Sequence, residues 1–294
     1  MAGAAGMLGR EIVEQWNAES SFEVVPTALN DSDLPNAKLM DISDEQSIDR
    51  VIDECDPDVV VNAAAYTAVD RAEDERDQAF LLNAKAPELL ARACKKHDAL
   101  FVHVSTDYVF SGELERPYVE TDVTGPKSVY GQSKLEGERR IEAVGGDWIT
   151  TRIAWLYGAS GPNFAETMIS LADKNPELKV VDDQLGNPTW AGDVARQLRS
   201  LIEIDARGTF HATNAGETTW FGFARAVFDR CGLADFPLLP CSTDEFPRPA
   251  PRPRNSRLDN LALREAGCDI MRPWQDALDD YVAARPLSSG DQAS

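Results

Sequence analysis

Short apolar runs alternate along the first half of the chain with longer segments that carry apolar residues at every third or fourth position. The runs have the length of buried strands, and the spacing in the longer segments is typical of helices that bury one face. Strands that alternate with helices form βαβ units with right-handed connections, which give a parallel sheet covered on both faces. The sequence therefore predicts an α/β fold, a doubly wound parallel sheet of the Rossmann type. The expected strands are Phe22–Pro26, Val59–Val61, Leu100–Val104 and Trp148–Arg152, and the expected helices are Glu45–Glu54, Glu73–His97 and Ser128–Ala143.

The pattern is looser after Arg152. We expect residues 1–152 to form a dinucleotide-binding domain to which later segments can return, residues 153–285 to form mainly a smaller substrate-binding region, and residues 286–294 to be a flexible tail. The proline-rich stretch 246–258 should be an extended, fixed loop. Helices are expected at Phe164–Asp173, Asp193–Ile204, Trp220–Cys231 and Leu258–Glu265.

Composition excludes several classes of function. A net charge of −21 over 294 residues argues against nucleic acid and anionic membranes as partners, because both require a basic surface. The chain has no apolar run of about 18 residues and no signal-peptide pattern, which favours a cytoplasmic location. The five cysteines are scattered without metal-ligand spacing, so we expect reduced thiols and no metal. Many aspartates and few lysines fit adaptation to high salt or an ordinary acidic enzyme.

A glycine-rich loop stands at the start of the chain. Gly3, Gly6 and Gly9 have G-x-x-G-x-x-G spacing and lead into the helix-like stretch Leu8–Trp16. Such a loop binds pyrophosphate when a buried strand delivers it to the N-terminus of a helix. The residues before Gly3 are too few for that strand, so we expect the first strand of the sheet to be missing from this sequence and the true start to lie upstream.

Tyr130 and Lys134 stand four residues apart in SVYGQSKLEGE. On a helix they share a face, so the ammonium group can lie beside the phenol. This proximity, together with a nicotinamide cation, is expected to lower the pKa of Tyr130 toward the working pH. The pair suits proton transfer to a carbonyl oxygen while a hydride reaches the carbon.

Polar and small residues follow two of the expected strands. Ser105, Thr106 and Asp107 end one strand, and ligands of open α/β folds bind at the carboxyl edge of the sheet. The small residues Ala63–Ala65 end another strand, where they would let a flat cofactor lie against the backbone or would serve tight packing.

The glycine loop and the segments NAAAYTAVDRAE, STDYVFSG, VYGQSKLEGE, RIAWLYG, NFAETM, DDQLGNPTWAGDVA and RPRNSRLDN together resemble the dTDP-4-dehydrorhamnose reductases of the extended short-chain dehydrogenase/reductase superfamily. The resemblance runs from Gly3 to about Trp274. It implies reduction of the C4 ketone of dTDP-4-dehydro-L-rhamnose by NADPH or NADH, in the biosynthesis of a nucleotide sugar.

The resemblance also implies the roles of particular residues. Tyr130 would be the proton donor, Lys134 would hold the nicotinamide ribose, and Thr106 would hydrogen-bond the ketone. Asp107 would orient sugar hydroxyls, Trp155 would form a wall of the sugar site, and Arg252 and Arg254 would meet the diphosphate. The expected cofactor-binding residues are Gly3, Gly6, Met7, Leu8, Gly9, Asp41, Ile42, Ala63, Ala65, Tyr66, Thr67, Val104, Tyr130 and Lys134.

Several alternatives stay open at this point. Asp41 fits a helix cap as well as an adenine contact, and Asn83 fits a cap as well as a brace for the site. The sequence does not decide between NADP and NAD, and a homodimer is one assembly to consider. Relatives that bind magnesium do so through glutamates, but Gly192 and Asp193 stand near the second such position, so no metal is expected. A 4,6-dehydratase is disfavoured because Tyr108 stands where those enzymes place Glu. A reductase or an epimerase of another nucleotide-4-keto-sugar, or a non-catalytic regulatory subunit like that of methionine adenosyltransferase, remains an alternative.

Overall fold

Four parallel strands form the central sheet of the protein. The computed structural model describes residues 1–18, 22–30 and 34–285, so the expected tail 286–294 lies outside the described residues. The strand order is β10–β5–β4–β3, and neighbouring strands are parallel throughout. The strands are β3 (Val59–Asn62), β4 (Leu100–Thr106), β5 (Trp148–Ile153) and β10 (Gly208–His211). The predicted α/β fold with a parallel sheet is confirmed, and β10 comes from the second half of the chain.

The first two residues extend this sheet. The Ala2 N–H donates to the Val61 carbonyl at 2.8 Å, and the Thr27 N–H donates to the Met1 carbonyl at 2.9 Å. Met1 and Ala2 thus lie where a strand would stand, between β3 and the short parallel pair β1 (Thr27–Ala28) and β2 (Lys38–Leu39). The first strand, which was expected to be missing, is represented by these two residues.

The strand expected over Phe22–Pro26 is wrong, because strand pairing begins at Thr27. Residues 22–25 face a cavity of about 440 Å³ whose other wall is formed by Val59–Val61. In this stretch the Val25 carbonyl accepts a hydrogen bond from the Met1 amino group at 2.9 Å. Apolar composition predicted a strand here, but ladder bonds need a neighbouring strand.

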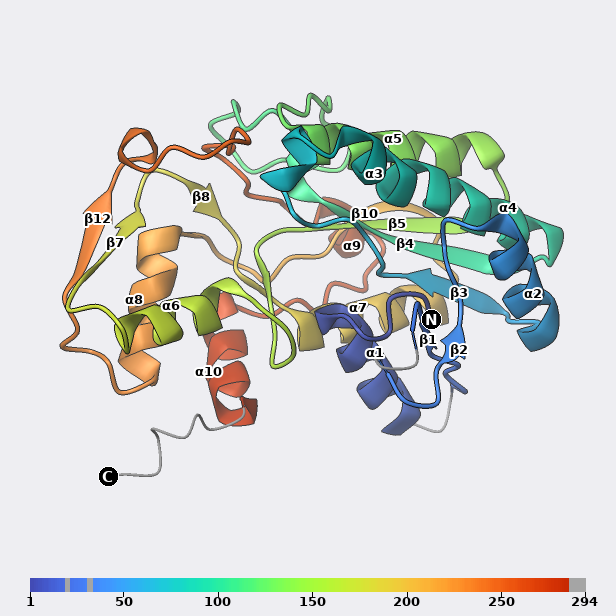
Figure 1. Cartoon of the computed structure of the whole chain (residues 1–294), viewed down its shortest axis with the longest axis horizontal. Coiled ribbons are helices and arrows are strands. Elements are labelled where there is room, and N and C mark those ends of the chain that lie inside the picture. Colours follow the sequence, from blue (N-terminus) through green and yellow to red (C-terminus); the bar gives the residue numbers. More distant parts are fainter. Residues whose placement is uncertain (19–21, 31–33, 286–294) are drawn as a thin grey trace.

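Helices cover both faces of the sheet (Figure 1). Successive residues of a strand point to opposite faces, so Val61 and Val102 join one core while Val60 and Phe101 join the other. Helices α1 (Met7–Ala18) and α7 (Ala191–Glu203) pack on the first face, and α2 (Glu45–Cys55), α4 (Ala86–Lys96) and α5 (Val129–Val144) cover the second.

The helix expected over Glu73–His97 is interrupted. It consists of η1 (Arg71–Glu73), α3 (Arg76–Phe80), the π-helical turn η2 (Leu81–Lys85) and α4. Helix α5 lies close against the π turn, so that a Cβ atom added at Gly137 would stand 2.1 Å from the Asn83 carbonyl oxygen. Gly137 therefore sets the distance between α5 and the π turn.

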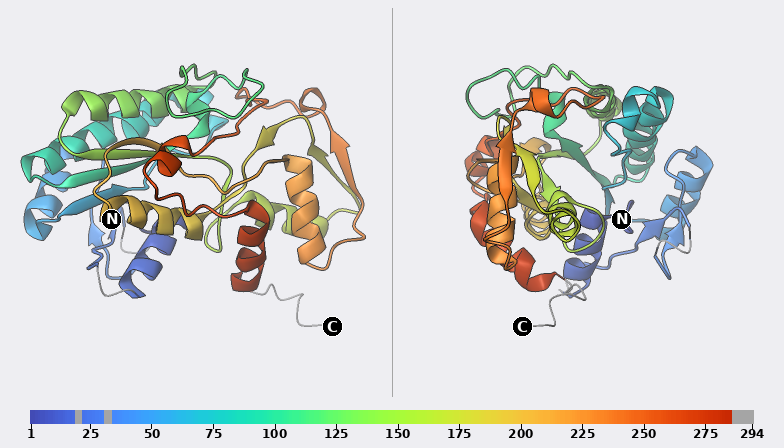
Figure 2. Two further views of the ribbon diagram at one scale, coloured as in Figure 1. Left: turned by 180° about the vertical axis from the view of Figure 1, so that it is seen from behind. Right: turned by 60° about the vertical axis from the view of Figure 1, so that its left-hand side comes forward.

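The second half of the chain builds a smaller region beside the sheet (Figure 2). Its core is aromatic, with Tyr157, Phe223, Trp274 and Tyr281 all buried. The helices are α6 (Phe164–Ala172), α8 (Trp220–Arg230) and α10 (Trp274–Ala284), and the strands are β6 (Leu156–Tyr157), β7 (Leu178–Val181), β8 (Leu185–Gly186), β9 (Thr189–Trp190), β11 (Thr218–Thr219) and β12 (Leu238–Cys241). Helix α9 (Leu261–Glu265) instead packs against β10, and its Leu263 joins the core between the sheet and helices α1 and α7. Helix α10 and the short strands were not predicted, because two-residue pairings leave no periodic signal.

The close packing at Gly137 yields a stability prediction. Gly137→Ala should lower the free energy of unfolding by about 1–3 kcal/mol, because the added methyl group forces α5 away from the π turn. The matched control is Gly125→Ala, whose added Cβ would meet only the Ser111 Cβ, at 3.6 Å. The control should stay within about 0.5 kcal/mol of the parent in chemical denaturation. Equal stability of the two variants would contradict the prediction.

Candidate active site

The glycine loop lies at the point where the strand order reverses, between Met1–Ala2 and β3. Gly3 has a φ of 77°, and a Cβ atom there would stand 2.5 Å from the Ala64 nitrogen. A Cβ atom at Gly9 would stand 2.0 Å from the Gly3 carbonyl oxygen. Both positions therefore require glycine. The loop leads directly into α1, whose N-terminal N–H groups and dipole favour an anion.

The residues expected around the cofactor lie in part along one cavity. A hollow of about 240 Å³ is lined by Gly3, Asp41, Ile42 and Ala65, among other residues. The Asp41 carboxylate accepts hydrogen bonds from the Ser43 N–H and hydroxyl at 2.8 and 2.7 Å. The N-cap of α2 is Asp44, so the interpretation of Asp41 as that cap is wrong. A glycine-lined cradle that continues into this cavity fits a dinucleotide.

Other residues of the expected cofactor set lie differently. Leu8 is buried in the core beneath the sheet, so its side chain points away from the loop and only its backbone can face a phosphate. The Met7 side chain lies against Gly158, at the edge of the second region. Gly6 accommodates a Cβ atom with one contact of 3.3 Å, and Ala63 is half-buried against the same core as Leu8.

Tyr130, Lys134 and Thr106 come together at the carboxyl edge of the sheet. Ser128, two residues before Tyr130, caps α5 by accepting the Gly131 N–H at 3.1 Å, and the helix begins at the next residue. The Lys134 Nζ atom donates to the Val104 carbonyl oxygen at 2.7 Å. The Tyr130 phenol lies near the hydroxyl of Thr106, which ends β4, and this hydroxyl favours the ionised form of the phenol. The helical spacing in the sequence thus does place both side chains over one strand end.

Burial shifts the pKa values of this group of residues in opposite directions. Desolvation raises the pKa of Tyr130 to about 12, although the Thr106 hydroxyl acts against the rise. The expected fall toward the working pH assumed a nicotinamide cation beside the phenol, so it stays a prediction for the protein with its cofactor bound; without the cofactor, burial is the largest influence on this pKa. Desolvation likewise lowers the pKa of Lys134 to about 8, against the influence of the Glu138 charge.

Asp107 is the buried carboxyl group of the site. The Thr106 hydroxyl donates to Asp107 Oδ1 at 2.8 Å, and the Asp107 side chain is 4% exposed. Desolvation raises the pKa of Asp107 to about 6, although hydrogen bonds from Thr106 and Ser256 oppose the rise. The next residue, Tyr108, packs edge-on against the Tyr130 ring with centroids 5.5 Å apart.

Buried polar bonds hold α5 in place. Glu138 accepts from Arg152 at 2.8 Å and from the Ser105 hydroxyl at 2.5 Å, and both partners lie on the sheet. Asn83 in the π turn donates to the Tyr66 carbonyl and to the Ser133 hydroxyl, at 3.0 Å each. Its oxygen also accepts the Tyr66 N–H at 2.8 Å. Asn83 is therefore a brace between the segment after β3 and α5, and not a helix cap.

Tyr66 and Thr67 stand at the rim of the expected cofactor channel. The Tyr66 hydroxyl donates to Glu75 at 2.6 Å, and Thr67 is exposed. Asn83 fixes the Tyr66 backbone, so the π turn, and not a ligand, determines the path of this segment.

Three of the four arginines of the proline-rich loop line a cleft of about 570 Å³, whose walls also carry Glu113, Glu115 and Asp183. Glu113 pairs with Lys127 at 3.1 Å. Arg252 pairs with Asp70 at 2.9 Å, and Arg254 lines the same cleft together with Lys127. Arg257 pairs with Glu217 at 2.9 Å. The cleft shares Lys127 and Arg252 with a small neighbouring hollow that Tyr108 lines, and the Tyr108 ring packs against Tyr130. Its cations offer local positive charge on a strongly acidic protein.

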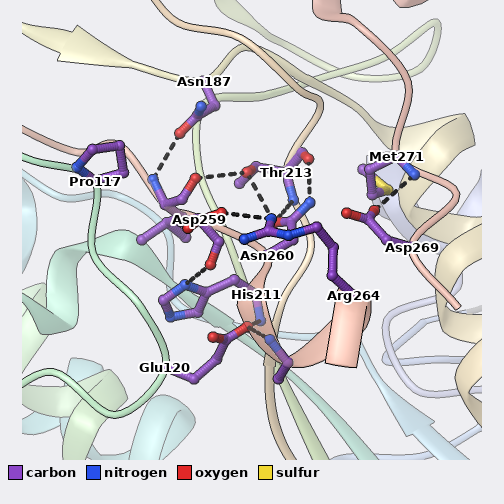
Figure 3. A network of polar contacts seen from close by, with 12 residues as sticks. Pro117, Glu120, Asn187, His211, Thr213, Asp259, Asn260, Arg264, Asp269 and Met271 are labelled. Atoms are coloured by element: carbon purple, nitrogen blue, oxygen red, sulfur yellow. Dashed lines mark hydrogen bonds and ion pairs between the residues drawn. The ribbon is translucent and has the colours of Figure 1, made fainter. Parts of the chain in front are cut away.

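The chain that follows this loop is anchored to the sheet (Figure 3). The Leu258 N–H donates to Asn187 Oδ1 at 2.8 Å, and the Asn260 side chain donates to the Thr213 carbonyl at 2.8 Å. The His211 ring bonds through Nδ1 to the Asp259 carbonyl oxygen at 3.1 Å, and the His211 backbone N–H donates to Glu120 at 2.9 Å. These bonds fix the end of the proline-rich loop relative to β10.

Trp155 lies just beyond β5 in a strained conformation. Its φ is 47°, and its ring stacks on Trp220 with centroids 3.6 Å apart and an interplanar angle of 9°. A Cβ atom at Gly186 would collide with the Trp155 ring, so that glycine is required there. Trp220 and Gly186 were not predicted as neighbours of Trp155, because no local spacing in the sequence connects them with it.

Metal-binding clusters and membrane-spanning helices were considered for the described residues. No group of three or more His, Cys, Asp or Glu side chains in this part of the chain is arranged to hold a metal ion. Among its helices, none is both long and apolar enough to cross a membrane.

The raised pKa of Asp107 yields a prediction for stability against pH. Between about pH 4 and pH 6 the folded protein keeps a proton that the unfolded chain releases, so the free energy of unfolding falls as the pH rises through this window. Asp107→Asn should remove this dependence and raise the free energy of unfolding at pH 7 by roughly 1–3 kcal/mol. Denaturant titrations at several pH values measure both effects. The exposed Asp173→Asn is the control and should change stability by less than about 0.5 kcal/mol; an Asp107→Asn curve parallel to the parent would contradict the assignment.

Comparisons with known proteins agree with this geometry. The family model described as RmlD substrate binding domain matches residues 1–286. A dTDP-4-dehydrorhamnose reductase of Burkholderia thailandensis is 41% identical over 294 residues, which cover 95% of each chain. A dTDP-4-keto-6-deoxy-D-glucose reductase of Streptomyces niveus is 38% identical, with 100% of this chain and 98% of the relative covered.

A solved structure is similar over nearly its whole length. The dTDP-4-dehydrorhamnose reductase of Bacillus anthracis in complex with NADP superimposes with a TM-score of 0.90 at 35% identity, and the match covers 96% of this chain and 97% of the other. The match to the family model and the identity to these relatives extend over the sheet, the glycine loop and the second region alike. The chain therefore belongs to the RmlD substrate binding domain family.

Proposed function

We propose that the protein reduces the C4 ketone of dTDP-4-dehydro-L-rhamnose to dTDP-L-rhamnose with NADPH or NADH. The observation that carries the proposal is the meeting of Tyr130, Thr106 and Lys134 at the carboxyl edge of the sheet, beside the glycine loop. The relatives named above support the substrate class and the use of NADP.

Tyr130 serves as the proton donor. With a pKa of about 12 the phenol keeps its proton at neutral pH, as a donor to the developing alkoxide must. When bound, the nicotinamide supplies the hydride to C4. Thr106 positions the ketone through its hydroxyl, and Lys134 holds the ribose hydroxyls while it is itself oriented by Val104.

The remaining expected residues divide between the two ligands. Residues 1–152 bind the dinucleotide, with the glycine loop on the pyrophosphate and Asp41 and Ile42 beside the adenosine. Residues 153–285 bind mainly the nucleotide sugar. Arg252 and Arg254 meet its diphosphate across the cleft, and Asp107 and Trp155 contact the sugar.

The decisive experiment follows cofactor oxidation. Purified protein, supplied with NADPH or NADH and dTDP-4-dehydro-L-rhamnose, should oxidise one cofactor per sugar reduced. An epimerase would turn over the sugar without net consumption of added cofactor, and a non-catalytic subunit would do neither. A 4,6-dehydratase is disfavoured because Tyr108, which follows the Thr-Asp pair, has no carboxyl group to move water.

Removal of the proton donor yields the sharpest prediction. Tyr130→Phe should lower kcat by at least about 100-fold and leave NADPH affinity nearly unchanged, because general acid catalysis is lost while the ring remains. Lys134→Ala should lower both kcat and the affinity for NADPH. Steady-state kinetics and cofactor titration measure these effects. The control Tyr281→Phe removes a hydroxyl that donates to Glu166 in the second region and should leave kcat unchanged; parental turnover by Tyr130→Phe would rule out Tyr130 as the donor.

The acidic surface supports further proposals about the setting. With 50 acidic against 29 basic residues, we infer a cytoplasmic enzyme adapted to high salt, and we propose a homodimer as its assembly. All five cysteines are free thiols, as a reducing compartment requires. Light scattering after size-exclusion chromatography tests the assembly.

Salt dependence of stability tests the adaptation. Raising KCl from about 0.1 M to about 2 M screens the mutual repulsion of the carboxylates, so the free energy of unfolding should rise. Thermal unfolding at a series of KCl concentrations measures it. Stability that is constant or falls across the series would contradict the adaptation.

A further inference from the structure

Three buried polar side chains form a continuous chain behind the candidate active site. Asn62 ends β3, His103 lies in the middle of β4, and Lys134 projects from α5. Asn62 Nδ2 lies 3.2 Å from His103 Nδ1, and His103 Nε2 lies 3.2 Å from Lys134 Nζ. Asn62 and His103 are fully buried and Lys134 is 2% exposed, so water does not satisfy these atoms. Each contact must therefore pair a donor with an acceptor.

The orientation of the Asn62 amide is fixed by the backbone. Its Oδ1 accepts the Ala64 N–H at 3.1 Å, in the segment expected to line the cofactor channel. The amide therefore turns its NH₂ group toward His103, and this group can only donate. His103 Nδ1 must accept, so the proton of the neutral ring is on Nε2. A doubly protonated ring would oppose the same NH₂ group with an N–H.

This tautomer determines what Lys134 can be. The Nε2–H points at Lys134 Nζ, and an ammonium group has three donors and no acceptor. A neutral amine has a lone pair that accepts the Nε2–H and two N–H groups, one of which donates to the Val104 carbonyl. Every contact in the chain of three is satisfied with the amine, whereas the ammonium leaves two donors facing each other.

We propose that Asn62 and His103 are positioning residues that favour the neutral amine of Lys134 over the ammonium in the cofactor-free protein, through a fixed His103 tautomer. For its catalytic consequence this inference rests on the proposed function. Lys134 then begins the cycle ready to take up a proton when ligands bring negative charge to the site, and its ionisation falls in the working range of the enzyme.

The surrounding charges agree with this assignment. On α5 itself, Glu138 lies one turn from Lys134 and favours the ammonium, but its charge is shared with Arg152 of β5. Tyr130, one turn in the other direction, is a neutral phenol, and Asp107 beyond the end of β4 is bonded to Thr106. Burial lowers the pKa of His103 well below its usual range, so the ring stays neutral. Burial also lowers the pKa of Lys134 to about 8.

The tautomer can be read directly and has an internal control. Nitrogen-15 NMR of the cofactor-free protein distinguishes protonated from unprotonated ring nitrogens, and the chain has three histidines. His103 should show a protonated Nε2. His211, which is buried to the same degree, bonds to the Asp259 carbonyl through Nδ1 and should show the opposite tautomer. A protonated Nδ1 at His103 would overturn the proposal.

Variants of Asn62 test the effect on Lys134. Asn62→Ser replaces the obligatory donor with a hydroxyl that can also accept, and Asn62→Asp places an acceptor opposite Nδ1. Both release the tautomer and should raise the pKa of Lys134, so that amine-specific modification of Lys134 at pH 8 slows by about tenfold in Asn62→Asp and by less in Asn62→Ser. The Nζ nitrogen-15 titration measures the same shift, and the alkaline limb of kcat/KM should move with it.

The outcomes separate this proposal from the proposed function. The NMR and modification experiments use protein without substrate or cofactor, so they stand whatever sugar the enzyme reduces. An unchanged Lys134 titration in the uncharged Asn62→Ser, with the fold retained, would overturn the inference. So would an ammonium group in the parent with a pKa near its ordinary value. Neither result would alter the NADPH oxidation assay.

Discussion

The attachment of α5 to the sheet through buried polar bonds is the constraint on which the site depends. Glu138 pairs with Arg152 and Ser105, and Lys134 bonds to Val104, in a region from which water is excluded. A buried ion pair that loses one partner typically destabilises a protein by about 3–5 kcal/mol, so such bonds define one position strictly. Apolar packing alone would allow the helix to slide. Gly137 against the π turn completes the restraint, and Tyr130 meets Thr106 as a result.

The same helix links the two ligand sites. Its first turn faces Thr106 and Tyr108, where the arginine-lined cleft begins, and its second turn faces the chain of Asn62 and His103 that leads to the glycine loop. Chemistry at this edge therefore depends on contacts between segments far apart in the sequence. The cleft brings Lys127 and three arginines together beside the carboxylates of Glu113, Glu115 and Asp183, on a protein whose acidic residues otherwise dominate.

The sequence predicted the parts of this structure that have a local signature. Strands buried on both faces, such as Leu100–Val104, are apolar runs, and the Tyr130–Lys134 spacing follows from the helical period. The strand at Phe22–Pro26 failed because strand formation requires a neighbour, and the π turn within Glu73–His97 left no mark on apolar spacing. The raised pKa of Tyr130 in the protein without a cofactor was not predicted, because burial depends on the whole fold. His103 and Trp220 were not identified, since their partners lie on other segments.

The stacked indoles of Trp155 and Trp220 give the protein an intrinsic signal in ultraviolet circular dichroism and fluorescence. One ring follows β5 of the sheet, and the other opens α8 of the second region, so the stack spans the junction between the two parts. Two indoles in parallel contact at 3.6 Å are electronically coupled, and this coupling depends steeply on their separation and tilt. A change in the separation or tilt of the two rings would therefore alter the ultraviolet circular dichroism and emission of the unlabelled chain, so the protein carries a spectroscopic probe of this junction in its own sequence.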